Sequence, residues 1–156
     1  MQYRKTIMPL ETNGWIEYSP YLTLEERNED HSWLTFMSID SIIDHSDETT
    51  ELLFGYSKRI IQKEFEIKSI AKDRGIPINA TDLVKREMER IKTFEAEHRD
   101  GEIFGYTFIY YYEIKNVTPS LSSDSPWKKL FKLIELFKEI KGLKDDQIRL
   151  VVWFDW

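Results

Sequence analysis

The chain closes in a run of bulky residues, Arg-Leu-Val-Val-Trp-Phe-Asp-Trp, that extends from Arg149 to Trp156. Side chains that are β-branched or aromatic favour strands, because they fit the half-buried pleated surface of a sheet. A chain end normally frays unless it is held by other elements, and a free end of this composition would invite aggregation. The run therefore predicts a strand over Gln147–Trp156 that is built into a sheet, at its centre.

Length and composition indicate a soluble globular chain. The 156 residues suit one domain over 1–156 with a core of useful size. Hydrophobic residues make up 41% and charged residues 32%, which argues against a disordered chain. Aromatic residues reach 14%, and this content favours a sheet with aromatic faces.

Charge and cysteine content exclude several classes of function. The net charge of −6 argues against a dedicated nucleic-acid binder, which usually carries a basic surface. The absence of Cys excludes disulfides, thiolate zinc sites and a Cys nucleophile. The first ten residues lack the apolar core of a signal peptide, and no apolar run approaches membrane-spanning length. We therefore expect a cytoplasmic protein with no nucleic-acid or membrane partner.

Side-chain periodicity predicts further elements in mixed order. The predicted strands are Gly14–Leu22, Ser32–Ile39 and Glu102–Lys115, and the predicted helices are Asp47–Tyr56, Asn79–His98 and Ser125–Lys141. A short helix could begin at Ser41–Ile43, whereas Ser57–Ala71 fits neither helical nor strand periodicity. This order differs from regular βα alternation. It predicts an α+β fold, a mostly antiparallel sheet with about three to four helices packed on it.

Local signals refine these elements. Leu24–Asp30 is predicted as a charged turn, and Asn116–Pro126 as a loop. Asn79 or Thr81 can cap the helix that follows, and Ser125 with Pro126 opens the last helix. Alternation in Glu102–Lys115 places Phe104, Tyr106 and Phe108 on one face, with Ile109 and Tyr111 on the other. Because both faces are largely apolar, this strand is predicted to be interior.

Several segments resemble, in order, an uncharacterised family found in bacteriophages and prophage-bearing bacteria. They are Leu52–Arg59, the turn Arg74-Gly75-Ile76-Pro77, the helix start Asn79–Asp82, the strand Gly105–Tyr110 and the closing run Arg149–Asp155. Members of that family pair an Arg-Gly-Leu-Pro turn with a closing strand that ends Phe-Asp-Asn. Here Trp156 stands in place of the last Asn, and the family's Asp-Gly-His becomes Asp100-Gly101-Glu102. The resemblance implies a phage-related accessory protein and no established activity.

Histidine and carboxylate residues are the candidates for a metal site. His31 follows Asp30 and His98 follows Glu97, so each imidazole has an acidic neighbour. No two histidines have the short spacing of ligands on one helix, and all lie near element ends. His31 and His98 are therefore weak metal candidates beside the alternative of ordinary surface histidines, and no cofactor is expected.

Two charged residues stand out as candidate binding residues. Asp155 lies between Phe154 and Trp156 in the closing strand, where a carboxylate needs a partner or an outward position. Arg74, beside Gly75, could present its guanidinium to an anion or pair with an acid. A structural pair between Arg74 and Asp155 is a further possibility.

Aromatic side chains offer a contact surface. Tyr111 and Trp153 could be exposed for a partner, or they could belong to the core under a helix. Since the sequence contains no nucleophile elbow and no phosphate-binding loop, we expect an interaction protein with a protein partner or a second copy. The alternatives are a small hydrolase that uses carboxylates and a His-bound metal, and an acidic inhibitor or immunity-like protein.

Overall fold

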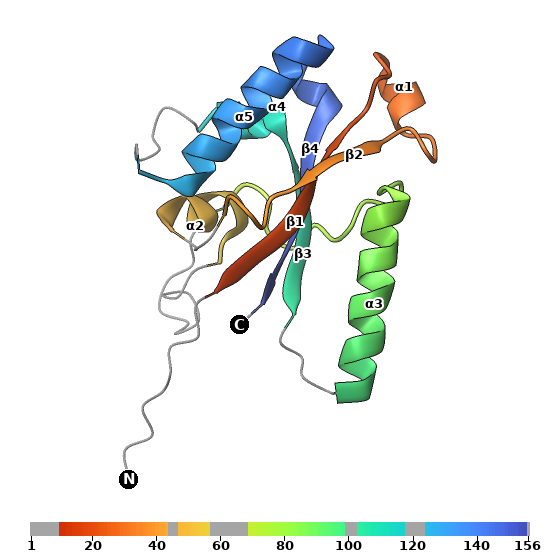
Figure 1. Ribbon diagram of the computed structural model, residues 1–156, viewed down its shortest axis with the longest axis vertical. Helices are drawn as coiled ribbons and strands as arrows, with labels where there is room; N and C mark the ends of the chain where they lie inside the picture. The colour runs from red at the N-terminus through yellow and green to blue at the C-terminus, as the bar shows by residue number, and fades with distance from the viewer. Residues whose placement is uncertain (1–9, 44–46, 57–68, 99–102, 118–123, 156) are drawn as a thin grey trace.

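A computed structural model describes residues 10–43, 47–56, 69–98, 103–117 and 124–155. Its centre is one antiparallel sheet with the strand order β2-β1-β4-β3. The strands are β1 Glu11–Tyr18, β2 Leu34–Ser38, β3 Phe104–Tyr110 and β4 Ile148–Asp155. Helices pack on this sheet, so the predicted α+β class is confirmed (Figure 1).

The closing strand β4 lies inside the sheet, as its composition predicts. It pairs with β1 along its whole length and with β3 on the other side. Every residue from Ile148 to Phe154 is buried. Successive side chains point to opposite faces, so β4 contributes apolar residues to two separate cores.

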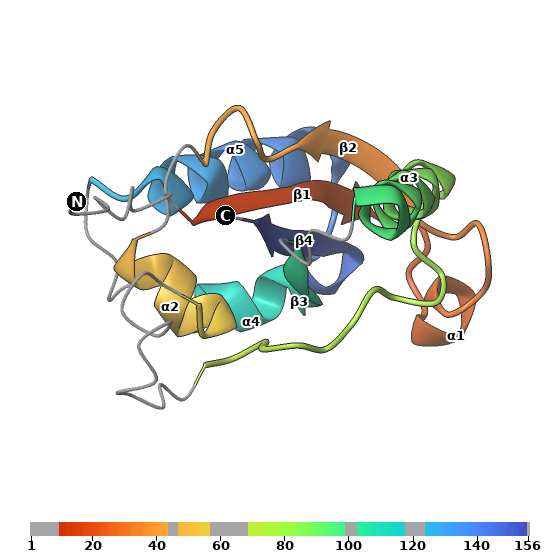
Figure 2. The ribbon, with the colours of Figure 1, turned by 90° about the horizontal axis from the view of Figure 1, so that it is seen from below.

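The helices are α1 Leu24–Arg27, α2 Glu48–Phe54, α3 Asp82–His98, α4 Tyr111–Lys115 and α5 Pro126–Lys141, followed by the 3₁₀ turn η3 Asp145–Gln147. Figure 1 shows α5 and α3 on opposite sides of the strands. Figure 2, seen from below, shows the strands in succession, with α5 alongside β2 and β1. Both faces of the sheet therefore carry a helix.

Each face has its own hydrophobic cluster. The larger cluster joins Leu150, Val152 and Phe154 of β4 to Trp127 and Ile134 of α5. The smaller cluster lies under α3 and is made of Val84, Met88, Ile91, Val151 and Trp153, with Ala80 at its edge. Alternation along β4 thus explains why a single strand supports both layers.

The prediction that the strand over Glu102–Lys115 is interior is wrong. β3 covers only Phe104–Tyr110 and pairs with β4 alone, at the edge of the sheet. Tyr111–Lys115 turns into α4, where Tyr110 N–H donates to the Glu113 carboxylate at 2.9 Å. The apolar character of both faces reflects two covering layers rather than two neighbouring strands.

A bulge at Gly105 corrects the predicted facing of β3. Its φ of +70° belongs to the left-handed region that glycine adopts easily, and the register with β4 shifts between Phe104 and Thr107. Phe104 therefore packs with the larger cluster, while Tyr106 and Phe108 pack with the smaller one. Simple alternation placed all three rings on one face.

Other boundaries differ by a few residues. β1 begins at Glu11, and the predicted turn over Leu24–Asp30 contains the helix α1, capped by Thr23. The Ser41–Ile43 segment forms turns rather than a helix. α3 begins at Asp82, with the Thr81 hydroxyl accepting the Val84 N–H at 3.4 Å. These are the small shifts expected where caps and turns decide element ends.

The last helix follows its sequence signals. Pro126 opens α5 after Ser125, and Gly142 ends it with φ +68°. The Ser125 hydroxyl does not cap the helix but donates to the Asp47 carboxylate at 2.6 Å. Residues 57–68, most of the ambiguous segment, lie outside the described residues, as do 118–123 of the predicted loop.

Candidate functional site

A buried ion pair lies on the α3 side of the sheet. Arg149 Nε donates to Glu17 Oε1 at 2.7 Å, and the two side chains are 2% and 0% exposed. Arg149 Nη1 also donates to the Asn79 amide oxygen at 3.0 Å, while the Thr81 N–H donates to Glu17 Oε2 at 2.7 Å. The guanidinium lies 3.9 Å from the ring centroid of Trp33. The pair therefore links β1 and β4 to the start of α3.

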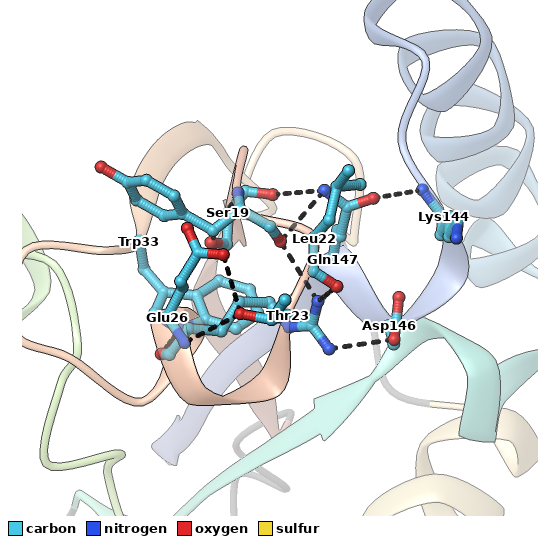
Figure 3. A network of polar contacts seen from close by, with 10 residues as sticks. Ser19, Leu22, Thr23, Glu26, Trp33, Lys144, Asp146 and Gln147 are labelled. Carbon is cyan, nitrogen blue, oxygen red and sulfur yellow. Dashed lines mark hydrogen bonds and ion pairs between the residues drawn. The ribbon is translucent and has the colours of Figure 1, made fainter.

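A second polar network adjoins this pair around Arg27. Arg27 donates to the carbonyls of Tyr21 and Leu22 at 3.1 and 2.8 Å and to the Asp146 carboxylate at 3.0 Å. The Gln147 amide donates to the Ser19 carbonyl at 3.0 Å. Figure 3 shows Asp146 and Gln147 facing the segment that runs from Ser19 to Leu22.

The two networks meet at the Arg27 carbonyl. It accepts hydrogen bonds from Asn79 Nδ2 at 2.8 Å and from Trp33 Nε1 at 2.9 Å. Each charged group in the two networks is bound by another group of the same chain. The networks therefore have a structural role, which is to hold the sheet, the α1 segment and the start of α3 together. Sequence reasoning missed it, although an Arg or a Glu inside an otherwise apolar strand is a usable signal.

Asp155 lies at the end of β4, beside Asn13 and Glu11 of β1. Asn13 Nδ2 donates to Asp155 Oδ2 at 3.1 Å, and Glu11 is its cross-strand partner. Burial and the nearby charges of Glu11 and Asp40 raise the pKa of Asp155 to about 6. Among the described residues, no group of three His or carboxylate side chains could hold a metal ion.

Arg74 pairs with Glu113 rather than with Asp155. Its two terminal nitrogens donate to the two Glu113 oxygens at 2.9 and 2.8 Å, and also to the carbonyls of Phe108 and Ile70. Burial acts to raise the pKa of Glu113, but the hydrogen bonds from Arg74 and the Tyr110 N–H outweigh it and lower that pKa. The guanidinium is therefore bound within the chain, by Glu113 and by two backbone carbonyls.

The two aromatic candidates are core residues. Tyr111 is 2% exposed and Trp153 is 4% exposed, so the structure does not present either ring at the surface. The Tyr111 hydroxyl donates to the Glu135 carboxylate at 2.8 Å; burial first, and then this bond, raise the pKa of Tyr111. Trp153 packs under α3. Tyr111 and Trp153 are therefore too buried to act as the exposed contact residues that the sequence analysis considered.

The two histidine candidates are far apart. His31 Nδ1 lies 3.9 Å from the carboxylate of Asp82, the first residue of α3, and its side chain is exposed. His98 is the last residue of the same helix, about 24 Å away along its axis at the usual rise per residue. The structure does not bring them together as ligands of one metal.

Two hollows border α3. One of about 400 Å³ is lined by Ile76, Met88 and Tyr106, with Lys85, Glu89 and Lys92 at its sides. Another of about 250 Å³ is lined by Trp33, Leu34 and Thr35 of the sheet, by His31 and by residues at the start of α3. In the second hollow the Thr35 hydroxyl donates to the Thr81 hydroxyl at 2.9 Å, and His31 faces Asp82 instead of either hydroxyl.

The two edges of the sheet differ in how they are covered. The segment around Arg74 shields β3, since Gly75 N–H donates to the Tyr106 carbonyl at 2.8 Å and Arg74 N–H to the Thr107 hydroxyl at 3.2 Å. On β2, by contrast, the described parts of the chain form no backbone hydrogen bonds with the outer edge. Leu34–Ser38 contains neither a charged residue nor a proline.

An apolar flank of α5 adjoins this open edge. Phe137 stacks on Phe36 of β2 with ring centroids 3.7 Å apart, whereas Phe131 faces Tyr111 of α4. At about 100° per residue, Leu136 and Ile140 project from α5 beyond Phe137, on the side away from Phe131. They are 53% and 72% exposed, and Leu34 at the start of β2 is 45% exposed.

No helix within the described ranges has the length and apolar character needed to cross a bilayer. Comparison of the chain with models of known families, with curated proteins and with solved structures finds no match.

Proposed function

We propose that this chain is an accessory or interaction protein that acts through protein contacts. The observation that carries this proposal is the open β2 edge with its apolar flank on α5, called here the β2–α5 surface (Leu34–Ser38, Leu136 and Ile140). An edge strand offers unpaired backbone N–H and C=O groups to another strand. Natural proteins that avoid such pairing protect the edge with charges, proline or a covering segment.

The contrast within this sheet strengthens the proposal. The β3 edge is covered by the segment around Arg74, and the buried polar networks bind their own charged groups. Within the described residues, β2 carries no charge, proline or covering segment, and its register with β1 is interrupted by a bulge at Phe36. This surface combines a strand edge that can form hydrogen bonds with the exposed side chains of Leu136 and Ile140. Such a surface suits a protein partner that adds a strand to the sheet.

The resemblance described above supports a phage or mobile-element setting for this role. It rests on the Arg74–Pro77 turn and the closing strand Arg149–Asp155. In the structure the turn shields β3 and the strand forms the centre of the sheet, so both motifs serve the scaffold. The contact surface itself lies outside those motifs.

Site-specific photocrosslinking in the organism that encodes the chain tests this function. A photoreactive residue at Leu136 should give protein adducts, whereas one at Tyr112 of α4, which is 47% exposed and directly follows the opposite edge strand β3, serves as the matched control. Adducts at Leu136 well above those at Tyr112 support the proposal. Equal, background-level labelling at both positions would overturn it.

One observation favours the hydrolase alternative, and it is the raised pKa of Asp155. A carboxyl that titrates near neutral pH can act as a general acid or base. The measurement is hydrolysis of a panel of chromogenic esters, phosphates and glycosides by the native chain and by Asp155→Asn. Turnover by the native chain that is lost in the variant would support the alternative, and the absence of turnover in both would count against it.

A further inference from the structure

We propose that the larger hollow beside α3 binds a small apolar monocarboxylate, such as the anion of a medium-length fatty acid. Its volume of about 400 Å³ falls within the range of small-molecule sites, roughly 300–1,000 Å³. The hollow is separate from the β2–α5 surface, because α3 and α5 lie on opposite sides of the strands (Figure 1). The ligand site and the contact surface can therefore be tested independently.

Three elements hold the apolar walls of this hollow in place. Met88 of α3 is only 7% exposed and belongs with Trp153 to the smaller cluster. Tyr106 lies on β3, and Ile76 belongs to the segment that the Gly75 N–H ties to the Tyr106 carbonyl at 2.8 Å. The walls are therefore in position before a ligand arrives, which lowers the cost of ordering them on binding.

The hydrogen-bond donors that line the hollow are not used elsewhere. Within the described residues, the ammonium groups of Lys85 and Lys92 form no hydrogen bond or ion pair, and the Tyr106 hydroxyl has no hydrogen-bond partner. Burial, and then the nearby charge of Glu95, raise the pKa of Tyr106, so its hydroxyl keeps its proton at neutral pH and can donate. Three donors around apolar walls suit a ligand with a carboxylate head and an apolar body.

The charges at the rim favour a single negative group on the ligand. Glu89 lies between Lys85 and Lys92 in the sequence of α3 and on the same flank of the helix. Two ammonium groups and one carboxylate leave one net positive charge. An amphipathic cation would meet two like charges, whereas a dianion would bring its second charge close to Glu89. A monoanion satisfies both conditions.

Nuclear magnetic resonance of the full chain, isotopically labelled at its methionine methyl groups, gives the first test with sodium octanoate as the probe. Met88 lines the hollow, whereas Met37 on β2 packs against the larger cluster and serves as the internal control. The Met88 signal should shift and saturate with a dissociation constant of about 1 mM or lower, while the Met37 signal stays in place. Absence of a shift at Met88 up to about 10 mM octanoate, or equal shifts at both methyl groups, would overturn the proposal.

Two further ligands of the same chain length test the role of charge. Octanol keeps the apolar chain without a charge, and octylammonium replaces the negative charge with a positive one. Octanoate should bind about threefold or more tightly than octanol, and octylammonium should bind most weakly. Equal affinity for octanoate and octanol would overturn the assignment of an anionic ligand.

Removal of the two lysine charges tests the same point from the side of the protein. The double variant Lys85→Gln, Lys92→Gln should raise the dissociation constant for octanoate by about threefold or more and leave that for octanol unchanged. The double variant Lys129→Gln, Lys132→Gln removes two exposed charges from α5, on the other side of the sheet, and is the matched control. If both double variants bind octanoate equally well, the lysines of α3 do not hold the carboxylate.

A variant that fills the hollow tests the location of the site. Ile76 is partly exposed at the wall, so Ile76→Trp adds a large side chain to the hollow and leaves the lysine charges in place. Binding of both octanoate and octanol should be lost, while urea denaturation shows that the variant is folded. A folded Ile76→Trp protein that still binds octanoate with the native affinity would overturn the proposal.

Discussion

Arg149 of β4 and Glu17 of β1 form an ion pair with a separation of 2.7 Å, with both side chains withdrawn from solvent. The pair also holds Asn79 and the Thr81 N–H at the start of α3. A buried ion pair is a weak net source of stability, but removal of one partner strands the other charge in a low-dielectric environment. The pair therefore makes the α3 layer dependent on a correct β1–β4 register.

Arg149→Met should lower the free energy of unfolding by about 3–5 kcal/mol, because Glu17 is left buried without its cation. The measurement is urea denaturation followed by Trp fluorescence. The double variant Glu17→Gln, Arg149→Met removes both charges and keeps an acceptor for Thr81 N–H, so it should be more stable than Arg149→Met alone. A double variant less stable than the single one would contradict this account.

Gly105→Ala should destabilise the fold by about 2–3 kcal/mol, since the new Cβ would lie 2.7 Å from the rings of Phe154 and Tyr56 at a φ of +70°. Gly142→Ala is the matched control, because its φ is +68° and no atom lies within 4 Å of the added Cβ. It should cost about 1 kcal/mol for the backbone alone. Equal thermal stabilities of the two variants would show that packing at the bulge is unimportant.

Asp155→Asn should stabilise the protein at neutral pH and leave it unchanged near acid pH. The folded-state pKa of Asp155 is raised from 3.8 to about 6, so folding favours the protonated carboxyl. The resulting loss of folding stability is absent below the unfolded-state pKa of Asp155. It grows as the pH rises from that value through the folded-state pKa and is complete at neutral pH. Because the carboxyl is partly solvated, the gain is on the order of 1 kcal/mol.

Denaturation of native protein and Asp155→Asn at about pH 4 and about pH 7 measures this effect. A difference between the two proteins that is larger at the lower pH would have the wrong sign and would contradict the assignment. The Asn13 amide can still donate to an Asn side-chain oxygen at position 155, so the local geometry is preserved.

Arg74→Ala should cost about 1–2 kcal/mol and should expose the β3 edge, because the forked pair with Glu113 is lost. Arg74→Lys keeps the charge without the fork and should recover part of the loss. The pKa of Glu113 is lowered in the folded state, so its stabilisation is present at neutral pH and is lost as pH falls through that lowered value.

Amide hydrogen exchange at Gly75, whose N–H donates to the Tyr106 carbonyl, reads out this change together with urea denaturation. Faster exchange at Gly75 in Arg74→Ala, with unchanged exchange in the middle of β4, is the expected pattern. Unchanged exchange at Gly75 would show that the segment shields this edge without help from the Arg74 side chain.

Local signals were sufficient where one short segment decides its own structure. Pro126 and Gly142 mark the ends of α5, and the apolar run after Gln147 predicts the central strand β4. These are choices of backbone conformation and burial that neighbouring residues determine. The α+β class followed from the order of such segments.

Tertiary structure decided everything that depends on which segments meet. The apolar faces of β3 were compatible with an interior strand, but β3 pairs with β4 alone, and the segment around Arg74 covers its outer side. Arg74 found Glu113 instead of Asp155 for the same reason. β2 likewise lies at an edge because it pairs with β1 alone, while β1 pairs on its other side with β4 from a distant part of the chain. Sequence periodicity indicates which residues are buried, but partners are set by long-range pairing that no local pattern encodes.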